Sequence, residues 1–104
     1  MHRYGRIDSN HAEIAQALRA IGCSVMSLAS LGNGCPDLLV GIFKRNLLLE
    51  VKDGDKSPSE QRLTVMEREW HETWKGQVVV VHNVDEAIAV VNDIARVSGN
   101  SILR

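Results

Sequence analysis

A charged pair inside an apolar run is the feature that most constrains this sequence. From Leu47 to Lys52 the chain reads LLLEVK, so Glu50 and Lys52 stand two positions apart among leucine and valine. Successive side chains of a β-strand point to opposite faces, so a strand here places Glu50 and Lys52 on one face and Leu49 and Val51 on the other. Burying this pair costs free energy unless each charge has a partner. The segment therefore predicts a strand with one apolar face and one face that carries paired charges.

A second strand-like run precedes this one, and a short polar pair separates the two. Residues 37–43 and residues 46–52 are both rich in leucine, valine and isoleucine, which predicts a hairpin with Lys44-Arg45 as its two-residue turn. The pair lacks the Asn-Gly chemistry that such turns favour. With this turn the paired residue numbers sum to 89, so Asp37 faces Lys52 across the hairpin.

This register gathers three ionisable side chains on one face. Asp37, Glu50 and Lys52 lie within the reach of diagonal neighbours, whereas an odd loop sends Asp37 to the other face unless a bulge intervenes. Two carboxylates can hold a hard divalent cation such as Mg²⁺, and a lysine beside them can stabilise developing negative charge. A metal-activated water at such a site suits phosphodiester hydrolysis. The alternative is structural, because Glu-x-Lys is common on solvated strand faces and an aspartate after proline is common in turns.

Periodicity predicts further elements before the hairpin. A first helix begins over Asp8-Ser9-Asn10, with Glu13 as the capping partner of Asn10, and runs to Gly22. A strand over residues 24–28 follows, and residues 32–36 form a loop by composition.

After the hairpin the chain alternates helix and strand. Thr64 and Glu67 form a T-x-x-E capping box before a helix, and Ser57-Pro58 offers a second, separate helix start. Residues 77–82 contain a valine run typical of a strand buried on both faces, and a last helix runs over residues 83–99. The order is α-β-β-β-α-β-α, which predicts an α/β fold with a mixed sheet flanked by helices.

Composition limits the class of protein. With 104 residues, of which 44% are hydrophobic and 24% charged, the chain is expected to form a single domain over residues 1–104. Its net charge is −1, whereas nucleic-acid-binding proteins usually carry an excess of Lys and Arg. A bound cation nevertheless makes the electrostatic field at its own site more positive. The apolar runs are too short to span a membrane and no signal-peptide pattern is present, so we expect a cytoplasmic protein with no membrane partner. Cys23 and Cys35 are expected to be free thiols.

Two short motifs in this order resemble a known superfamily. Gly34-Cys35-Pro36-Asp37 followed by residues 47–54, LLLEVKDG, resembles the PD-(D/E)XK nuclease signature, with the hairpin between the two motifs. The surrounding sequence is similar to the virus-type replication-repair nuclease domain, VRR-NUC, in the short stand-alone form often carried by phages. The resemblance covers residues 8–92, and its further matching pieces are residues 10–14, Leu63-Thr64 leading to Trp70, and residues 77–87.

The resemblance implies a restriction-endonuclease-like fold and an Mg²⁺- or Mn²⁺-dependent endonuclease. Its substrate would be DNA that is branched or otherwise structured, such as four-way junctions, during replication, recombination or repair in a bacterial or phage-infected cell. Asp37 and Glu50 resemble the family's metal ligands and Lys52 resembles its catalytic lysine; by the same resemblance, the backbone carbonyl of Val51 would point at the metal. Glu13 matches an acidic residue near the metal, or it serves only the helix cap.

Other positions are less constrained. Several relatives place a glutamine in the helix after the lysine, where this chain has Glu67; Gln61 lies nearby, and support of the site by either residue stays open. Candidates for contact with DNA lie in the loop before the first motif and in the segment after the second, where solvated loop residues are an equal alternative. These candidates are Ser30, Gly32, Asn33, Lys56 and Arg62.

An apolar stripe predicts how copies of the chain associate. Met66, Trp70 and Trp74 recur at helical spacing and favour core packing or a dimer contact over base stacking. A homodimer is expected, because two-fold dimers are the commonest oligomers and one small domain offers little surface to DNA. Two rival functions remain: a non-catalytic DNA-binding or assembly module with this fold, and a sequence-specific restriction enzyme, for which the chain is too short to hold an added recognition domain.

Overall fold

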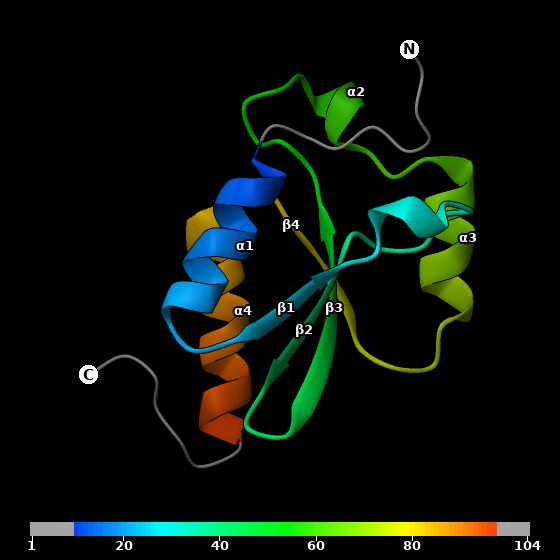
Figure 1. Ribbon diagram of the computed structural model, residues 1–104. Helices are drawn as coiled ribbons and strands as arrows, with labels where there is room; N and C mark the ends of the chain where they lie inside the picture. The colour runs from blue at the N-terminus through cyan, green and yellow to red at the C-terminus, as the bar shows by residue number, and fades with distance from the viewer. Residues whose placement is uncertain (1–9, 98–104) are drawn as a thin grey trace.

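Helices and strands follow one another in the predicted order (Figure 1), and the α/β fold class is confirmed. The computed structural model describes residues 10–97, so the predicted helix start at residues 8–9 and helix end at Gly99 lie outside the described residues. The short element η1 is a 3-10 turn, and α2 is the separate helical turn that Ser57-Pro58 allows. The elements are α1 (His11–Ala20), β1 (Ser24–Ser27), η1 (Ala29–Leu31), β2 (Leu38–Ile42), β3 (Arg45–Val51), α2 (Pro58–Gln61), α3 (Val65–Thr73), β4 (Val78–Val81) and α4 (Val84–Val97).

The four strands form one mixed sheet in the order β1-β2-β3-β4. The first three pair antiparallel, and β4 runs parallel to β3, which requires the crossover through α2 and α3. Val81 is fully buried, but Val78, Val79 and Val80 are only half-buried. The expectation that this strand is buried on both faces is therefore wrong, because β4 lies at an edge of the described sheet and is incompletely covered.

The β2–β3 hairpin turns one residue earlier than predicted. Phe43 and Lys44 form the two-residue turn, with φ of 51° and 63°, and the paired residue numbers sum to 87 rather than 89. The predicted register is thus wrong by two residues, and its continuation sets Asp37 opposite Glu50 instead of Lys52. Positive φ at both central residues gives a type I′ turn, whose twist matches that of the strands. Because the turn still has an even length, the three site residues keep one face.

α1 and α4 pack against the same face of the sheet and enclose the hydrophobic core (Figure 1). Ile14 and Leu18 of α1, Leu38 and Leu49 of the hairpin, and Val91 of α4 have no exposed surface. Full burial of such a side chain stabilises the fold by about 1.5–3 kcal/mol. This face therefore supplies most of the apolar stabilisation.

In the part of the chain that the structure describes, no helix is long and apolar enough to cross a membrane.

α3 lies on the other side of the sheet (Figure 1) and contains no fully buried residue. Met66 is 52% exposed and Trp74 is 47% exposed, while Trp70 is half-buried and stacks on Trp74 with ring centroids 4.5 Å apart. The predicted stripe is therefore not a core face. Gly34, with φ of 81°, passes so close to the start of α3 that a Cβ there would collide with the Met66 carbonyl. Only glycine suits both that backbone conformation and that approach.

Asn10 ties the start of α1 to the sheet. It occupies the N-cap position, but its side chain makes no capping bond; it donates instead to the carbonyl oxygens of Lys52 (3.3 Å) and His82 (3.0 Å). The predicted capping arrangement with Glu13 is therefore wrong. The amide thus bonds to carbonyl groups just beyond the ends of two parallel strands, and the His82 carbonyl also accepts from the Gly54 N–H (3.1 Å).

Candidate active site

Asp37 is held at the start of β2 by three backbone contacts. Its N–H donates to the Leu49 carbonyl (3.0 Å), its carbonyl accepts from the Leu28 N–H (2.7 Å), and its carboxylate Oδ2 accepts from the Val51 N–H (2.7 Å). The last bond directs the carboxylate at the end of β3, beside Glu50. A carboxylate held in this way is oriented before any ligand arrives.

Glu50 is buried next to Asp37, with 2% of its surface exposed. Burial, the charge of Asp37, a hydrogen bond between the two carboxyl groups and the charge of Glu67 raise the pKa of Glu50 to about 10, against the opposing charge of Lys52. Two carboxylates this close resist simultaneous ionisation. The Oε1 atom of Glu50 is buried without a hydrogen-bond partner, which is uncommon for a buried polar atom. The carboxyl pair is therefore short of positive charge.

Lys52 is held by α3. Its Nζ donates to Glu67 Oε1 at 2.8 Å, and the same oxygen accepts from the Thr64 N–H at 2.8 Å. The Thr64 hydroxyl accepts in return from the Glu67 N–H, which completes the predicted capping box. Burial by itself would lower the pKa of Lys52, but the hydrogen bond and charge of Glu67, aided by Glu50 and Asp37, raise it. Burial opposes the change at Glu67, whose pKa is lowered by its bonds to Lys52 and Thr64.

His71 lies one helical turn after Glu67 and approaches the same cluster. Its Nε2 is 3.5 Å from Glu50 Oε1, and burial lowers its pKa, an effect that the charge of Glu67 opposes and that of Lys52 reinforces. His71 was not among the predicted site residues, because its spacing from the other histidines does not suit a metal. The signal that finds it is helical: Glu67 and His71 are four residues apart, on one face of a helix.

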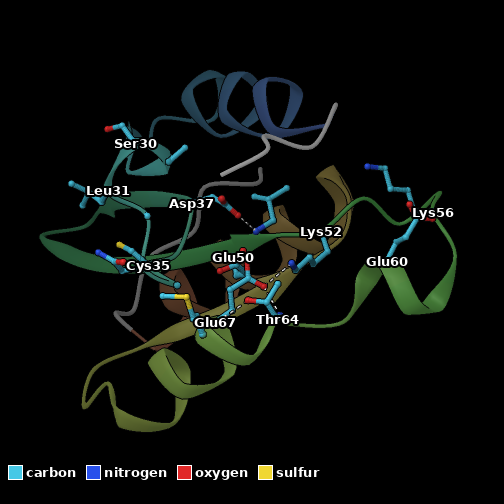
Figure 2. Close-up of a pocket in the computed structure, with 16 residues that line it drawn as sticks. Ser30, Leu31, Cys35, Asp37, Glu50, Lys52, Lys56, Glu60, Thr64 and Glu67 are labelled. Atoms are coloured by element: carbon cyan, nitrogen blue, oxygen red, sulfur yellow. Dashed lines mark hydrogen bonds and ion pairs between the residues drawn. The ribbon is translucent and has the colours of Figure 1, made fainter. Parts of the chain in front are cut away.

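These groups open onto a cleft of about 830 Å³ (Figure 2). The loop with Ser30 and Leu31 bounds it at one end, and Lys56 and Glu60 bound it at the other (Figure 2). The predicted site residues that line this cleft are Asp37, Glu50, Val51, Lys52, Ser30, Gly32, Asn33 and Lys56. Residues from both motifs thus meet on one surface.

Two predicted site residues lie outside this cleft. Glu13 is exposed on α1, and Arg62 is exposed just after α2; neither is among the lining residues. The open question about Glu67 and Gln61 has a structural answer. Glu67 contacts Lys52, whereas the Gln61 side chain donates to the carbonyl oxygens of Gly54 (3.3 Å) and Lys56 (2.6 Å) and braces the loop that carries Lys56.

Both cysteines are free, as predicted. Cys23 is buried in the core, and Cys35 lines the cleft. Burial raises the pKa of each thiol, and the charges of Glu50 and Asp37 raise that of Cys35 further. Both shifts disfavour the thiolate form, which is the nucleophilic form of cysteine.

Comparison with known proteins identifies the architecture. A scan of the sequence against family models finds no match, and a search of curated proteins finds no significant match, but the structure matches a solved structure described as a VRR_NUC domain. The match has a TM-score of 0.52 and 26% sequence identity, and it covers 77% of this chain and 87% of that structure. The chain has a VRR-NUC-like fold. The restriction-endonuclease-like architecture expected from the resemblance is thereby confirmed.

Proposed function

We propose that this VRR-NUC-like protein is a metal-dependent DNA endonuclease. The observation that carries the proposal is the convergence of Asp37, Glu50 and Lys52 on one wall of the cleft (Figure 2). Two acidic groups and an amine at one site are the groups that hydrolysis of a phosphodiester bond needs. The acidic groups can bind a cation, and the amine can stabilise the charge that develops on phosphate.

The donor set fits a hard divalent cation. Asp37 and Glu50 offer carboxylate oxygens, and burial together with the charge of Asp37 raises the pKa of Glu50, an electrostatic cost that a bound cation would lower. Within residues 10–97, no three His, Cys, Asp or Glu side chains gather as a metal-binding group. Mg²⁺ often binds through one or two carboxylates together with water and substrate phosphate, so Mg²⁺ or Mn²⁺ fits this set. The Val51 carbonyl would be a further ligand, and Glu13 stays a candidate outside this group.

The chemistry divides between the cation and the chain. When bound, the cation lowers the pKa of a water and neutralises phosphate charge. Asp37 and Glu50 would hold that cation at the open end of the hairpin, away from its turn. Lys52, whose raised pKa keeps its amine protonated at neutral pH, places positive charge where the scissile phosphate develops negative charge.

The two ends of the cleft offer contacts for DNA on both sides of the scissile bond. Ser30, Gly32 and Asn33 lie at one end and Lys56 at the other, so a strand crossing the cleft would pass the carboxylates between them. Arg62 would contact DNA only beyond the cleft. The preference for branched DNA, in replication, recombination or repair, is supported by the family resemblance.

A homodimer is part of the proposal. The apolar side chains Val65, Met66 and Trp74 of the α3 region are 70%, 52% and 47% exposed, which is unusual for large apolar residues grouped on one helix. Pairing of two chains through this surface would hide it and would present two clefts to a branched substrate. Light scattering at micromolar concentration, with and without DNA, tests the dimer; a monomer under both conditions counts against it.

The rival proposal is a DNA-binding or assembly module without catalysis. Such a module gains nothing from a buried glutamate beside an aspartate, which costs stability and places acidic groups against phosphate. The buried pair therefore favours catalysis.

Cleavage of labelled duplex, flap, single-stranded and four-way-junction DNA, with Mg²⁺, Mn²⁺ or chelator, is the direct test. Lys52→Ala should lower single-turnover cleavage by roughly 10²–10³-fold and leave DNA affinity nearly unchanged. Lys44→Ala is the matched control, because this lysine lies in the turn at the opposite end of the hairpin. Cleavage by the Lys52 variant at the wild-type rate, or by the wild type in chelator, would show that the assigned chemistry is wrong.

A further inference from the structure

Two buried polar atoms face each other without forming a hydrogen bond. Glu50 Oε1 and His71 Nε2 are 3.5 Å apart, longer than the roughly 2.7–3.2 Å of an ordinary N–H···O bond, and neither atom has another partner. The side chains are 2% and 13% exposed, so water does not readily take the place of a partner. Buried polar atoms nearly always have a hydrogen-bond partner. The missing bond therefore points to another state of the site, in which these two atoms are hydrogen-bonded.

The position of His71 defines what it can do. Glu50 lines the cleft, whereas His71 does not, so the imidazole meets the carboxyl group from outside the cleft. A carboxylate that binds a cation through one oxygen keeps the other for a hydrogen bond, and such outer partners fix the orientation of the ligand. Glu50 fits this arrangement, because Oε1 lies 3.5 Å from His71 Nε2 and the other oxygen would be the cation ligand.

We infer that His71 is a positioning residue for Glu50, and that its Nε2–H donates to Glu50 Oε1 when a divalent cation occupies the cleft. This inference rests on the proposed metal-dependent function. Glu67 holds Lys52 from the preceding turn of the same helix at 2.8 Å. α3 therefore orients both Glu50 and Lys52. The packing of α3 against the sheet decides whether these two side chains are correctly placed.

Binding of Mn²⁺ to the full chain without DNA, measured by calorimetry, tests this role. His71→Leu removes the donor but keeps an apolar side chain of similar size. Its dissociation constant for Mn²⁺ should rise by about 10–100-fold. The Mn²⁺ concentration that gives half-maximal cleavage should rise in parallel, while cleavage at saturating Mn²⁺ changes far less.

Three further variants separate positioning from packing. His71→Gln places an amide N–H close to the position of Nε2 and should recover most of the affinity, whereas His71→Asn is too short to reach Glu50 and should not. His82→Leu removes an imidazole that pairs with Glu86, away from the cleft, and should leave Mn²⁺ binding unchanged. If His71→Leu does not fold, the Gln and Asn variants decide the question by themselves.

The outcomes distinguish this inference from the proposed function. If the wild type binds Mn²⁺ and cuts DNA, but His71→Leu binds Mn²⁺ as tightly or the Gln and Asn variants behave alike, the positioning role is wrong and the nuclease proposal stands. If the wild type neither binds Mn²⁺ nor cuts DNA, both are overturned. Weaker Mn²⁺ binding in the Leu and Asn variants, with recovery in the Gln variant, supports both.

Discussion

The two faces of the sheet are held to their helices by different kinds of contact. Toward α1 and α4 the contacts are apolar, and Leu49 has no exposed surface. Toward α3 the closest contacts described are polar: Lys52 with Glu67, and Glu50 with His71. Glu50 is the next residue after Leu49 on β3, so one strand carries both kinds of contact on its opposite faces.

Because of this difference, one face of the sheet provides the stability of the fold and the other carries the groups of the candidate active site. The apolar face is close-packed and independent of pH or ions, so it can keep the chain folded whatever the site binds. The α3 face contains buried charges whose free energy depends on protonation and on a cation. A fold that relied on the second face would change its stability with every change at the site. A substitution on one face that leaves the other unchanged therefore separates the two contributions.

The largest effect is expected from the core side of β3. Leu49→Ala removes a fully buried side chain and should lower the free energy of unfolding by about 2–5 kcal/mol, measured by urea denaturation. The stabilisation gained on adding Mn²⁺ should stay the same, because the metal side is untouched. Glu50→Gln, one residue away, should show the reverse pattern: no loss of stability in chelator, and loss of the gain from Mn²⁺. Equal patterns in the two variants would mean that the faces are not separate.

The next largest effect is a pH dependence of the free energy of unfolding, which is caused by Glu50. Its pKa is raised to about 10 in the folded chain, so the folded protein keeps a proton that the unfolded chain releases above its ordinary pKa. The stability from that proton is fully present below about pH 4.5 and is lost as the pH rises toward 10. In chelator, the free energy of unfolding should therefore fall by roughly 1 kcal/mol per pH unit through neutrality. Urea melts at several pH values should show this slope for the wild type and a much shallower one for Glu50→Gln.

Local sequence patterns and the even length of the hairpin turn were enough to predict which site residues share a face of the sheet. Glu50 and Lys52 share a face because they are two apart on a strand, and Asp37 joins them because any two-residue turn keeps that parity. The pairing register of the β2–β3 hairpin could not be predicted from the sequence. A turn with positive φ at Phe43 and Lys44 uses residue types that rarely adopt that conformation, so the sequence favoured the neighbouring pair.

Contacts between segments that are distant in sequence could not be predicted from local sequence patterns. The Asn10 side chain bonds to carbonyl groups 42 and 72 residues further along, and no nearby residue signals this. His71 meets Glu50 only because α3 crosses that face of the sheet. Glu67 had a sufficient local explanation in its capping box, which concealed its second role with Lys52.

A smaller effect should separate the two roles of Glu67. Glu67→Ala removes both the cap and the partner of Lys52, and should cost about 1 kcal/mol of stability and lower cleavage on the order of tenfold. Glu67→Gln keeps an oxygen for both bonds and should retain most of each. Glu86→Ala is the matched control, since Glu86 accepts a hydrogen bond from the His82 N–H at the start of α4 and does not line the cleft. Cleavage that falls equally in the Glu86 and Glu67 variants would show that only helix capping matters.

The smallest effect is expected far from either face, in the hairpin turn. Lys44 is exposed and has φ of 63°, a conformation that costs an L-residue with a Cβ roughly 1–2 kcal/mol and costs glycine almost nothing. Glycine also loses more entropy on folding, so Lys44→Gly should stabilise the chain by a net of about 0.5–1 kcal/mol. Lys44→Ala keeps the Cβ and removes the same charge, so it should bring no such gain. Both variants should cut DNA at the wild-type rate, because the turn lies at the end of β2 and β3 opposite to Asp37 and Lys52. Urea denaturation and single-turnover cleavage of the two variants, measured side by side, test this. A gain in both variants would assign the effect to charge, and a change in cleavage would show that the turn and the site are coupled through the hairpin.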